Sequence, residues 1–242
     1  MLDFNSDPEV IKKLYDTPIK KGEVCFCYFG WAGVLIRTKN HVIGIDLGEK
    51  CLSYNHIASI DPLDLQLYSH THWDHFSRLV TKKIFETTHA PVVAEPQVAS
   101  ELTTDIPAHQ LKSPHSGDSI TINGFNVKTI AGIHPRPITL FRIVWDGCKL
   151  FHGADSGYVP LTKYGADLAF IPTGTPSPSC SPENGLKMVL DIKPRIVVAM
   201  HGTNKQMQKF RDLVIKNINQ LPDTQVMFAQ VKKVIKVSIS EN

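Results

Sequence analysis

The sequence lacks any long run of apolar residues. The longest largely apolar stretch, residues 28–36, has nine residues and contains two glycines, whereas a membrane-spanning helix needs about 20 apolar residues. The N-terminus carries Asp3 and Asp7 and has neither the basic start nor the apolar stretch of a secretory signal. The sequence therefore predicts a cytoplasmic protein with no membrane partner.

Cysteine is scarce, and neither sign of charge dominates. The five cysteines are odd in number and widely scattered, which excludes a disulfide framework and a cysteine-rich zinc knot. Cys25 and Cys27 would share one face of a strand, and we expect them to pack as small buried apolar side chains. The 26 Lys and Arg and 23 Asp and Glu give a net charge of +3 without a basic block, so no nucleic-acid partner is expected.

The composition is otherwise typical of a globular chain. Hydrophobic residues make up 42% and charged residues 20% of the 242 positions, which argues against a disordered protein. Pro8 and Glu9 are typical of the start of a helix. We expect residues 1–22 to form an N-terminal helical extension and residues 23–242 to form a single domain.

The rest of the sequence repeats one plan. In each half a hairpin ends in an Asp-x-Gly string, at residues 46–48 and 155–157. Later in each half a strand led by a proline, Pro62 or Pro194, ends at a histidine and precedes a helix. Two such halves predict two sheets face to face, with helices outside.

Hydrophobic periodicity and turn signals place the individual elements. Asp146-Gly147 is a strong signal for a hairpin turn. The expected strands are residues 24–29, 34–37, 42–46, 65–69, 91–94, 138–145, 149–152, 166–172, 195–200, 225–229 and 234–239. The expected later helices are residues 95–103, a helix that starts at 181–183 and ends before Pro194, and residues 204–219.

Four residues of the types that bind metals lie within six positions at the end of a predicted strand. They are His70, His72, Asp74 and His75. Residues i and i+2 of an extended chain point the same way, so His70 and His72 can bind one ion. Asp74 and His75, where the chain turns into a helix, can face a second ion, and the motif therefore predicts half of a two-metal site.

Further ligands are needed, because metal ions such as zinc take more protein ligands than this segment offers. His134, Asp155 and His201 each lie at or just beyond the end of an expected strand or apolar segment. A carboxylate such as Asp155 can bridge two ions with its two oxygens, which a neutral imidazole cannot do. We therefore expect these three residues to complete the site.

The order of these residues resembles the metallo-β-lactamase fold superfamily. The resemblance covers nearly the whole chain from Val24 onward and includes the strings at 151–157, 166–172 and 193–201. Within the superfamily the chain is similar to a compact branch that includes ascorbate-phosphate lactonase and metal-dependent hydrolases. The resemblance implies an α/β fold, a four-layer αββα sandwich, with a two-metal site.

The resemblance also implies a role for each candidate residue. The ligands of one ion would be His70, His72 and His134. The ligands of the other ion would be Asp74, His75 and His201. Asp155 would bridge the two ions, and Asp74 would also be the catalytic residue that accepts a proton from the nucleophilic water. Asp46 and His152 would orient the ligands through hydrogen bonds.

The expected activity follows from this site. Two divalent ions, two carboxylates and a hydroxide sum to about +1, which suits a small anionic substrate. Zinc is the expected metal, with manganese and iron as alternatives. We expect a dinuclear hydrolase in which a metal-bound hydroxide attacks a small ester, lactone or phosphoester. The alternatives are a nucleic-acid phosphodiesterase on the same fold and a non-catalytic metal-binding regulatory protein, and the oligomeric state stays open.

Two tryptophans lie close to the candidate ligands in the sequence. Trp73 lies inside the metal motif, and we expect it to pack beneath the ligand loop rather than to contact substrate. Gly30-Trp31-Ala32 stands where relatives in the compact branch usually carry Gly-His-Ala, so an indole replaces an imidazole near the first strand.

Overall fold

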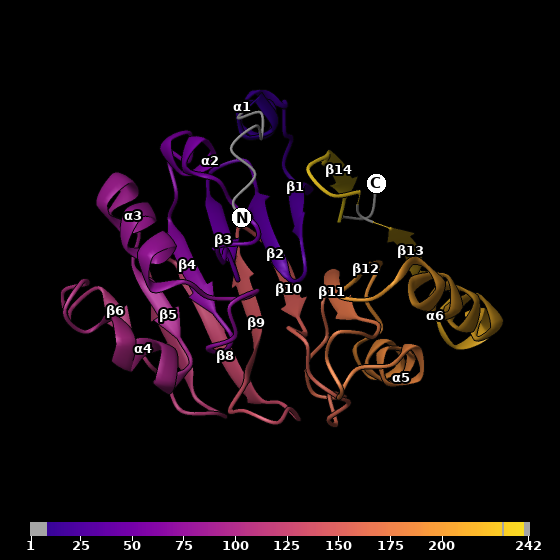
Figure 1. Ribbon diagram of the computed structural model, residues 1–242. Helices are drawn as coiled ribbons and strands as arrows, with labels where there is room; N and C mark the ends of the chain where they lie inside the picture. Colours follow the sequence, from indigo (N-terminus) through magenta and orange to yellow (C-terminus); the bar gives the residue numbers. More distant parts are fainter. Residues whose placement is uncertain (1–8, 229, 240–242) are drawn as a thin grey trace. The chain divides into compact units, whose positions relative to one another are not determined.

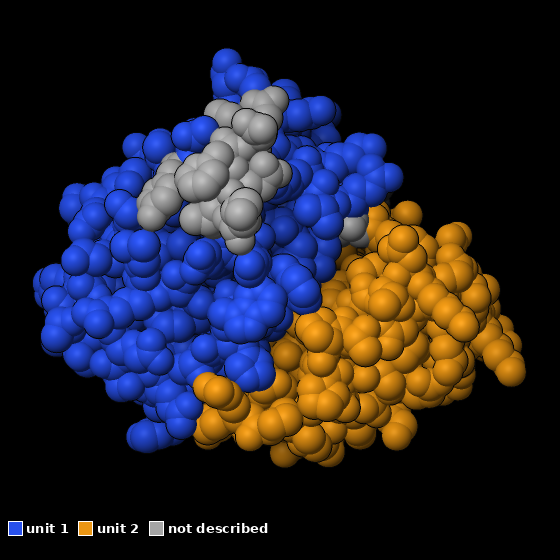
Figure 2. Space-filling model, in the orientation of Figure 1, with its two compact units in different colours: residues 1–115, 230–242 blue, residues 116–229 orange. Residues whose placement is uncertain are grey.

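The computed structural model describes residues 9–228 and 230–239 (Figure 1). The chain divides into two compact units (Figure 2): unit 1 consists of residues 1–115 and 230–242, and unit 2 consists of residues 116–229. Two seven-stranded sheets are present, together with six α-helices in the described part of the chain. The predicted α/β class is therefore confirmed.

The sheet of unit 1 combines antiparallel and parallel strands. Its order is β14-β1-β2-β3-β4-β5-β6. Neighbouring strands are antiparallel from β14 to β3 and parallel from β3 to β6. The strands are β1 (Glu23–Gly30), β2 (Gly33–Arg37), β3 (Val42–Ile45), β4 (Leu65–Tyr68), β5 (Val92–Ala94), β6 (Leu111–Lys112) and β14 (Val234–Ser238).

Apolar side chains hold the helices of unit 1 against this sheet. The helices are α1 (Glu9–Asp16), α2 (Tyr54–Ala58), α3 (Arg78–Thr88) and α4 (Pro96–Leu102). Cys25 and Cys27 alternate along β1 and lie in one buried cluster with Ile11 and Leu14 of α1. The prediction that these two cysteines pack as buried apolar side chains is confirmed.

The N-terminal helix is shorter than the expected 22 residues. Within the described residues it spans Glu9–Asp16, and the expected start at Pro8 lies outside them. A proline disfavours the helical conformation of the residue before it, so Pro18 accounts for the end of the helix ahead of Thr17. The Thr17 hydroxyl donates a 2.6 Å hydrogen bond to the Lys13 carbonyl and closes the last turn.

The sheet of unit 2 repeats this plan. Its order is β13-β12-β11-β10-β9-β8-β7, antiparallel from β7 to β10 and parallel from β10 to β13. The strands are β7 (Ser119–Ile122), β8 (Phe125–Ala131), β9 (Thr139–Trp145), β10 (Cys148–His152), β11 (Leu168–Pro172), β12 (Ile196–Met200) and β13 (Gln225–Phe228). The helices α5 (Pro182–Ile192) and α6 (Asn204–Lys216) contribute to its apolar core.

The repeated plan explains where the candidate ligands lie in each unit. In parallel sheets, functional side chains gather beyond the carboxyl ends of the strands. Asp46 follows β3 and His70 follows β4 in unit 1, whereas Asp155 and His201 follow β10 and β12 in unit 2. The internal repetition predicted from the sequence is therefore present in the fold.

Two turns in unit 2 depend on residues that tolerate positive φ. Asp146 and Gly147 join β9 to β10 with φ of 47° and 75°. Asn123 and Gly124 join β7 to β8 with φ of 47° and 82°. Both dipeptides are typical of tight hairpin turns. The second hairpin was absent from the sequence-based prediction, although its Asn-Gly turn was a usable signal.

Among the described residues, no helix has both the length and the apolar character needed to cross a membrane.

We predict that Gly147→Ala lowers stability through backbone strain alone. A Cβ at Gly147 would meet no atom within 4 Å, but its left-handed conformation costs an L-residue roughly 1–2 kcal/mol. Thermal unfolding should show a loss of about 2–4 °C per kcal/mol. Gly165→Ala is the matched control, because Gly165 is outside the positive-φ glycines and its Cβ would lie 4.0 Å from the nearest atom. Equal melting temperatures for the two variants would contradict the prediction.

Candidate metal centre

The metal motif of unit 1 forms the loop between β4 and α3. Ligand atoms of His70 and His72 lie within 4.8 Å of each other, and so do those of Asp74 and His75. The His70 ring lies 4.6 Å from that of His72 and 4.2 Å from that of His75, measured between centroids. His70, Asp74 and His75 are buried. The four residues predicted from this motif are therefore gathered within unit 1.

Asp46 holds this loop in place through hydrogen bonds. Its buried carboxylate accepts hydrogen bonds from the Ser69 backbone N–H (2.8 Å), the Ser69 hydroxyl (2.7 Å) and Nδ1 of His75 (2.8 Å). The carboxylate thereby ties the end of β3 to the end of β4. Asp46 itself has a φ of 48°, an unusual backbone conformation that is often found at functional sites.

These hydrogen bonds set the protonation of two imidazoles. His75 must carry its proton on Nδ1 to donate to Asp46. The Ser69 hydroxyl donates to Asp46, so it accepts from Nδ1 of His70 at 3.0 Å. In the neutral form of both rings, Nε2 then keeps the lone pair that a metal-binding imidazole requires.

Close packing around Gly48 explains why the Asp-x-Gly string of unit 1 ends in a glycine. A Cβ at Gly48 would lie 2.9 Å from the His75 carbonyl carbon and 3.0 Å from the Phe76 nitrogen. The backbone after β3 therefore packs directly against the metal motif. Gly157 has a similar function in unit 2, where an added Cβ would lie 3.1 Å from the Ser179 carbonyl oxygen.

The three ligands predicted in unit 2 also lie together. The Oδ2 atom of Asp155 is 3.4 Å from Nε2 of His134 and 3.9 Å from Nε2 of His201. One carboxylate oxygen is thus close to both imidazoles. The Asp155 backbone carbonyl accepts hydrogen bonds from the Ser177 hydroxyl and the Cys180 thiol, which holds the residue beneath the loop that follows β11. Burial raises the pKa of Cys180 to about 12, so this thiol stays protonated.

The Nδ1 atoms of His134 and His201 lie close to main-chain groups. Nδ1 of His201 lies 3.4 Å from the Gly174 carbonyl oxygen, an acceptor that leaves Nε2 with its lone pair. Nδ1 of His134 lies 3.3 Å from the carbonyl oxygen and 3.1 Å from the nitrogen of Arg136. Both rings thus have backbone partners that can fix their orientation.

The distances between donor atoms fit ligands of a shared cation. Ligands about 2.0–2.2 Å from one tetrahedral ion are roughly 3.3–3.6 Å apart. Asp74 Oδ2 and His75 Nε2 are separated by 3.6 Å in unit 1, and His134 Nε2 and Asp155 Oδ2 by 3.4 Å in unit 2. Direct N–H···O hydrogen bonds are shorter, at about 2.7–3.2 Å. Each unit therefore presents imidazole and carboxylate donors at a spacing that fits a bound metal ion.

His152 is fully buried at the end of β10. Its Nδ1 accepts a 3.3 Å hydrogen bond from the Ala154 backbone N–H, and its ring lies 6.1 Å from that of Phe170. Ala154 has a φ of 49° and directly precedes Asp155. The predicted role of His152 in orienting a ligand stays a prediction.

Other residues around the motif were missed by the sequence analysis. Ser69 is the first, and its only signal was its place between a strand and the motif. Cys51 is the second, since its buried Sγ lies 3.6 Å from the Asp46 carbonyl oxygen and 3.8 Å from that of Asp74. The prediction that Trp73 packs beneath the ligand loop was wrong: the residue is 55% exposed, whereas His70 and His75 in the same loop are buried.

We predict that Asp46→Asn weakens metal binding by about 10–100-fold, as changes to partners behind a metal ligand typically do. The asparagine amide lacks the negative charge of the carboxylate that accepts hydrogen bonds from Nδ1–H of His75 and from the N–H and hydroxyl of Ser69. Competition with a chromophoric chelator measures the affinity. Asp64→Asn is a matched control, because Asp64 also accepts a backbone hydrogen bond in unit 1, from Val42 at 2.7 Å, but lies outside the motif. Unchanged metal affinity in the Asp46 variant would contradict this role.

Proteins of known sequence and structure resemble the chain over most of its length. A metal-dependent hydrolase from Polynucleobacter asymbioticus is 25% identical to the chain, and the match covers 78% of this chain and 78% of that protein. A metallo hydrolase from Ignicoccus hospitalis has a TM-score of 0.72 at 18% identity and covers 89% of this chain and 98% of its own. A metallo-β-lactamase fold protein from Bacillus subtilis has a TM-score of 0.68 at 16% identity and covers 90% and 100%.

The two structural likenesses confirm the fold that the sequence resemblance implied. The sequence identifies the family, because residues 47–202 match the Beta-lactamase superfamily domain. This segment includes all seven candidate ligands, from His70 to His201. The chain belongs to the beta-lactamase superfamily.

Proposed function

We propose that the protein is a hydrolase that depends on two divalent metal ions and cleaves a small ester, lactone or phosphoester. The observation that carries the proposal is the position of Asp155, whose Oδ2 lies 3.4 Å and 3.9 Å from the Nε2 atoms of two histidines in unit 2. A carboxylate oxygen between two imidazoles suits a ligand shared by two ions. The names of the relatives as metal-dependent or metallo hydrolases agree with this proposal.

The donor chemistry supports a division of the ligands between two ions. In the proposal, His70, His72 and His134 hold one ion. Asp74, His75 and His201 hold the other. Asp155 would bridge the two ions. Imidazole and carboxylate donors suit zinc, and also manganese and iron.

The cofactor would supply the reaction with a nucleophile at neutral pH, since a bound divalent ion lowers the pKa of water to about 7 and polarises the oxygen under attack. Asp74 is the residue proposed to accept the proton from the attacking water. Asp74 is buried, and its Oδ2 lies 3.6 Å from His75 Nε2 in the same loop. Asp46 and Ser69 fix the ring of His75 and thereby the loop.

Charge supports an anionic substrate. Asp74 and Asp155 provide two negative charges, and neutral imidazoles provide none, so two divalent ions and a hydroxide leave a centre of about +1. A carboxylate or phosphate group on the substrate would be attracted to such a centre. The proposal therefore favours small anionic esters, lactones and phosphoesters.

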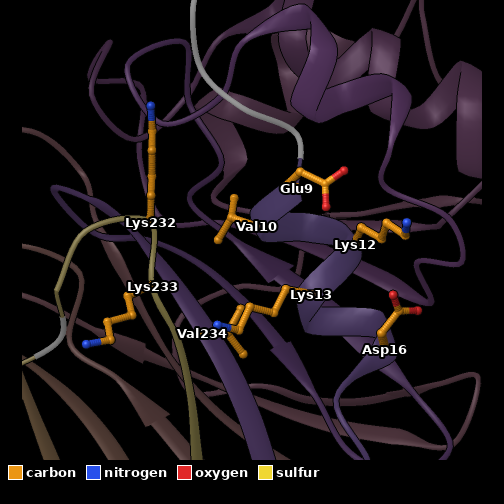
Figure 3. A pocket seen from close by; sticks show the side chains of 8 residues that line it. All are labelled: Glu9, Val10, Lys12, Lys13, Asp16, Lys232, Lys233 and Val234. Atoms are coloured by element: carbon orange, nitrogen blue, oxygen red, sulfur yellow. The ribbon is translucent and has the colours of Figure 1, made fainter.

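A nucleic-acid phosphodiesterase has less support. Four lysines from two segments of unit 1 line a cavity of about 430 Å³ (Figure 3). Lys12 and Lys13 belong to α1, whereas Lys232 and Lys233 precede β14. Glu9, Asp16, Val10 and Val234 complete the described lining, which includes no aromatic residue and none of the candidate ligands. Single-stranded nucleic acids bind to grooves that combine basic charge with aromatic stacking surfaces.

We predict about two metal ions per chain after reconstitution, measured by elemental analysis, together with hydrolysis of an ester, lactone or phosphoester in a substrate panel. His70→Ala and Asp155→Ala should lose metal and reduce kcat/KM by more than the roughly 100-fold typical of residues behind the ligands. His115→Ala is the control, because this histidine is exposed and outside the ligand set.

Two outcomes would contradict the proposal. Full activity in Asp155→Ala would remove the bridging ligand from the account. Stoichiometric metal without turnover of any ester, lactone or phosphodiester would instead favour a non-catalytic metal-binding protein.

A further inference from the structure

We propose that Trp31, Trp73 and Lys50 form a recognition surface for a substrate that carries a planar aromatic group next to a negative charge. This inference rests on the proposed function and deepens it, since it names the substrate class. All three residues belong to unit 1, and Trp73 lies between the candidate ligands His72 and Asp74. The surface therefore adjoins the loop that would hold the metals.

Trp73 is the exposed part of this surface. Its side chain is 55% exposed, although it belongs to a loop whose neighbours His70, Asp74 and His75 are buried. Indole rings supply large apolar contact areas in binding sites while their N–H stays available. An exposed tryptophan within a metal-binding loop is thus well placed to contact a ligand.

Trp31 is held in a strained conformation beside it. Trp31 has a φ of 53°, a left-handed backbone conformation that is unfavourable for a bulky L-residue. The Tyr28 hydroxyl donates a 2.7 Å hydrogen bond to the Trp31 carbonyl oxygen and stabilises this turn. Retained strain of this kind is more common at functional sites than elsewhere.

Cys51 connects the Trp31 turn to the metal motif. Its Sγ lies 3.7 Å from the Gly30 carbonyl oxygen, next to Trp31, and 3.8 Å from the Asp74 carbonyl oxygen, next to Trp73. The turn also packs closely on this thiol, because a Cβ at Gly33 would lie 2.3 Å from Sγ. The two tryptophans are thus held by a common buried support.

The rings and the lysine define the ligand chemistry. The indoles of Trp31 and Trp73 meet edge to face, with centroids 5.4 Å apart and planes at 74°. The Lys50 ammonium lies 5.2 Å from the Trp73 centroid. A planar ring can stack on the exposed indole surface, and a carboxylate or phosphate on that ring can pair with the adjacent ammonium.

Calorimetric titration of the metal-loaded protein tests this assignment without relying on turnover. The probes are 1-naphthoate, which is planar and anionic; cyclohexanecarboxylate, which is anionic but not planar; and 1-naphthalenemethanol, which is planar but neutral. We expect 1-naphthoate to bind about tenfold more tightly than cyclohexanecarboxylate, in line with the usual effect of one stacked ring. It should also bind more tightly than 1-naphthalenemethanol, because only the carboxylate can pair with the Lys50 ammonium.

Three variants separate the contributions. Trp73→Ala should weaken 1-naphthoate about tenfold and leave cyclohexanecarboxylate unchanged, whereas Trp73→Phe should restore most of the affinity. Lys50→Met should weaken both carboxylates and leave 1-naphthalenemethanol unchanged. Leu79→Ala is the control, because Leu79 is 53% exposed on α3 of the same unit and outside the surface.

Several results would overturn the inference. Equal affinity for all three probes, or an unchanged 1-naphthoate affinity in folded Trp73→Ala, would do so while leaving the hydrolase proposal intact. Tighter binding of a single-stranded oligonucleotide than of 1-naphthoate, with a steep salt dependence, would assign the surface to nucleic acid instead. Naphthoate binding that requires Trp73 and Lys50, in a protein without hydrolytic activity, would support the surface and contradict the proposed function.

Discussion

The organisation of the metal motif in unit 1 depends on the hydrogen bonds that the Asp46 carboxylate accepts. This carboxylate is fully buried, and it is stabilised by three hydrogen bonds from Ser69 and His75. Hydrogen bonds to a charged group each contribute about 1.5–3 kcal/mol, so losing a partner would leave a costly buried charge. The same bonds determine which nitrogen of His70 and His75 carries the proton. One carboxylate thus couples the stability of the loop to its ability to bind a cation.

Unit 2 reaches a comparable arrangement by different means. Main-chain groups lie within hydrogen-bonding distance of Nδ1 of His134 and of His201. The Asp155 carbonyl oxygen accepts hydrogen bonds from Ser177 and Cys180. Glycines at the ends of the two Asp-x-Gly strings permit close backbone packing in both units. The repeated fold therefore supplies a ligand set with rigid supports in each unit.

The sequence was sufficient to predict the elements whose signals are local. Asp146-Gly147 indicated its hairpin, and the His70–His75 motif indicated its loop, because turn chemistry and ligand spacing are encoded by adjacent residues. The support from Ser69 and Cys51 could not be predicted, since it depends on contacts between segments that are distant in sequence. The exposure of Trp73 was missed for a related reason: a tryptophan is equally compatible with a core and with a binding surface until its loop is folded.

The central claim is that two divalent ions are held by the seven proposed ligands, His70, His72, Asp74, His75, His134, Asp155 and His201. A crystal structure of the metal-loaded protein, with anomalous data collected at the absorption edge of the bound metal, tests it most directly. The account predicts two anomalous peaks, with Asp155 coordinating both ions and with His70 and His75 at separate peaks. A single bound ion, or metal bound away from these histidines, would contradict it.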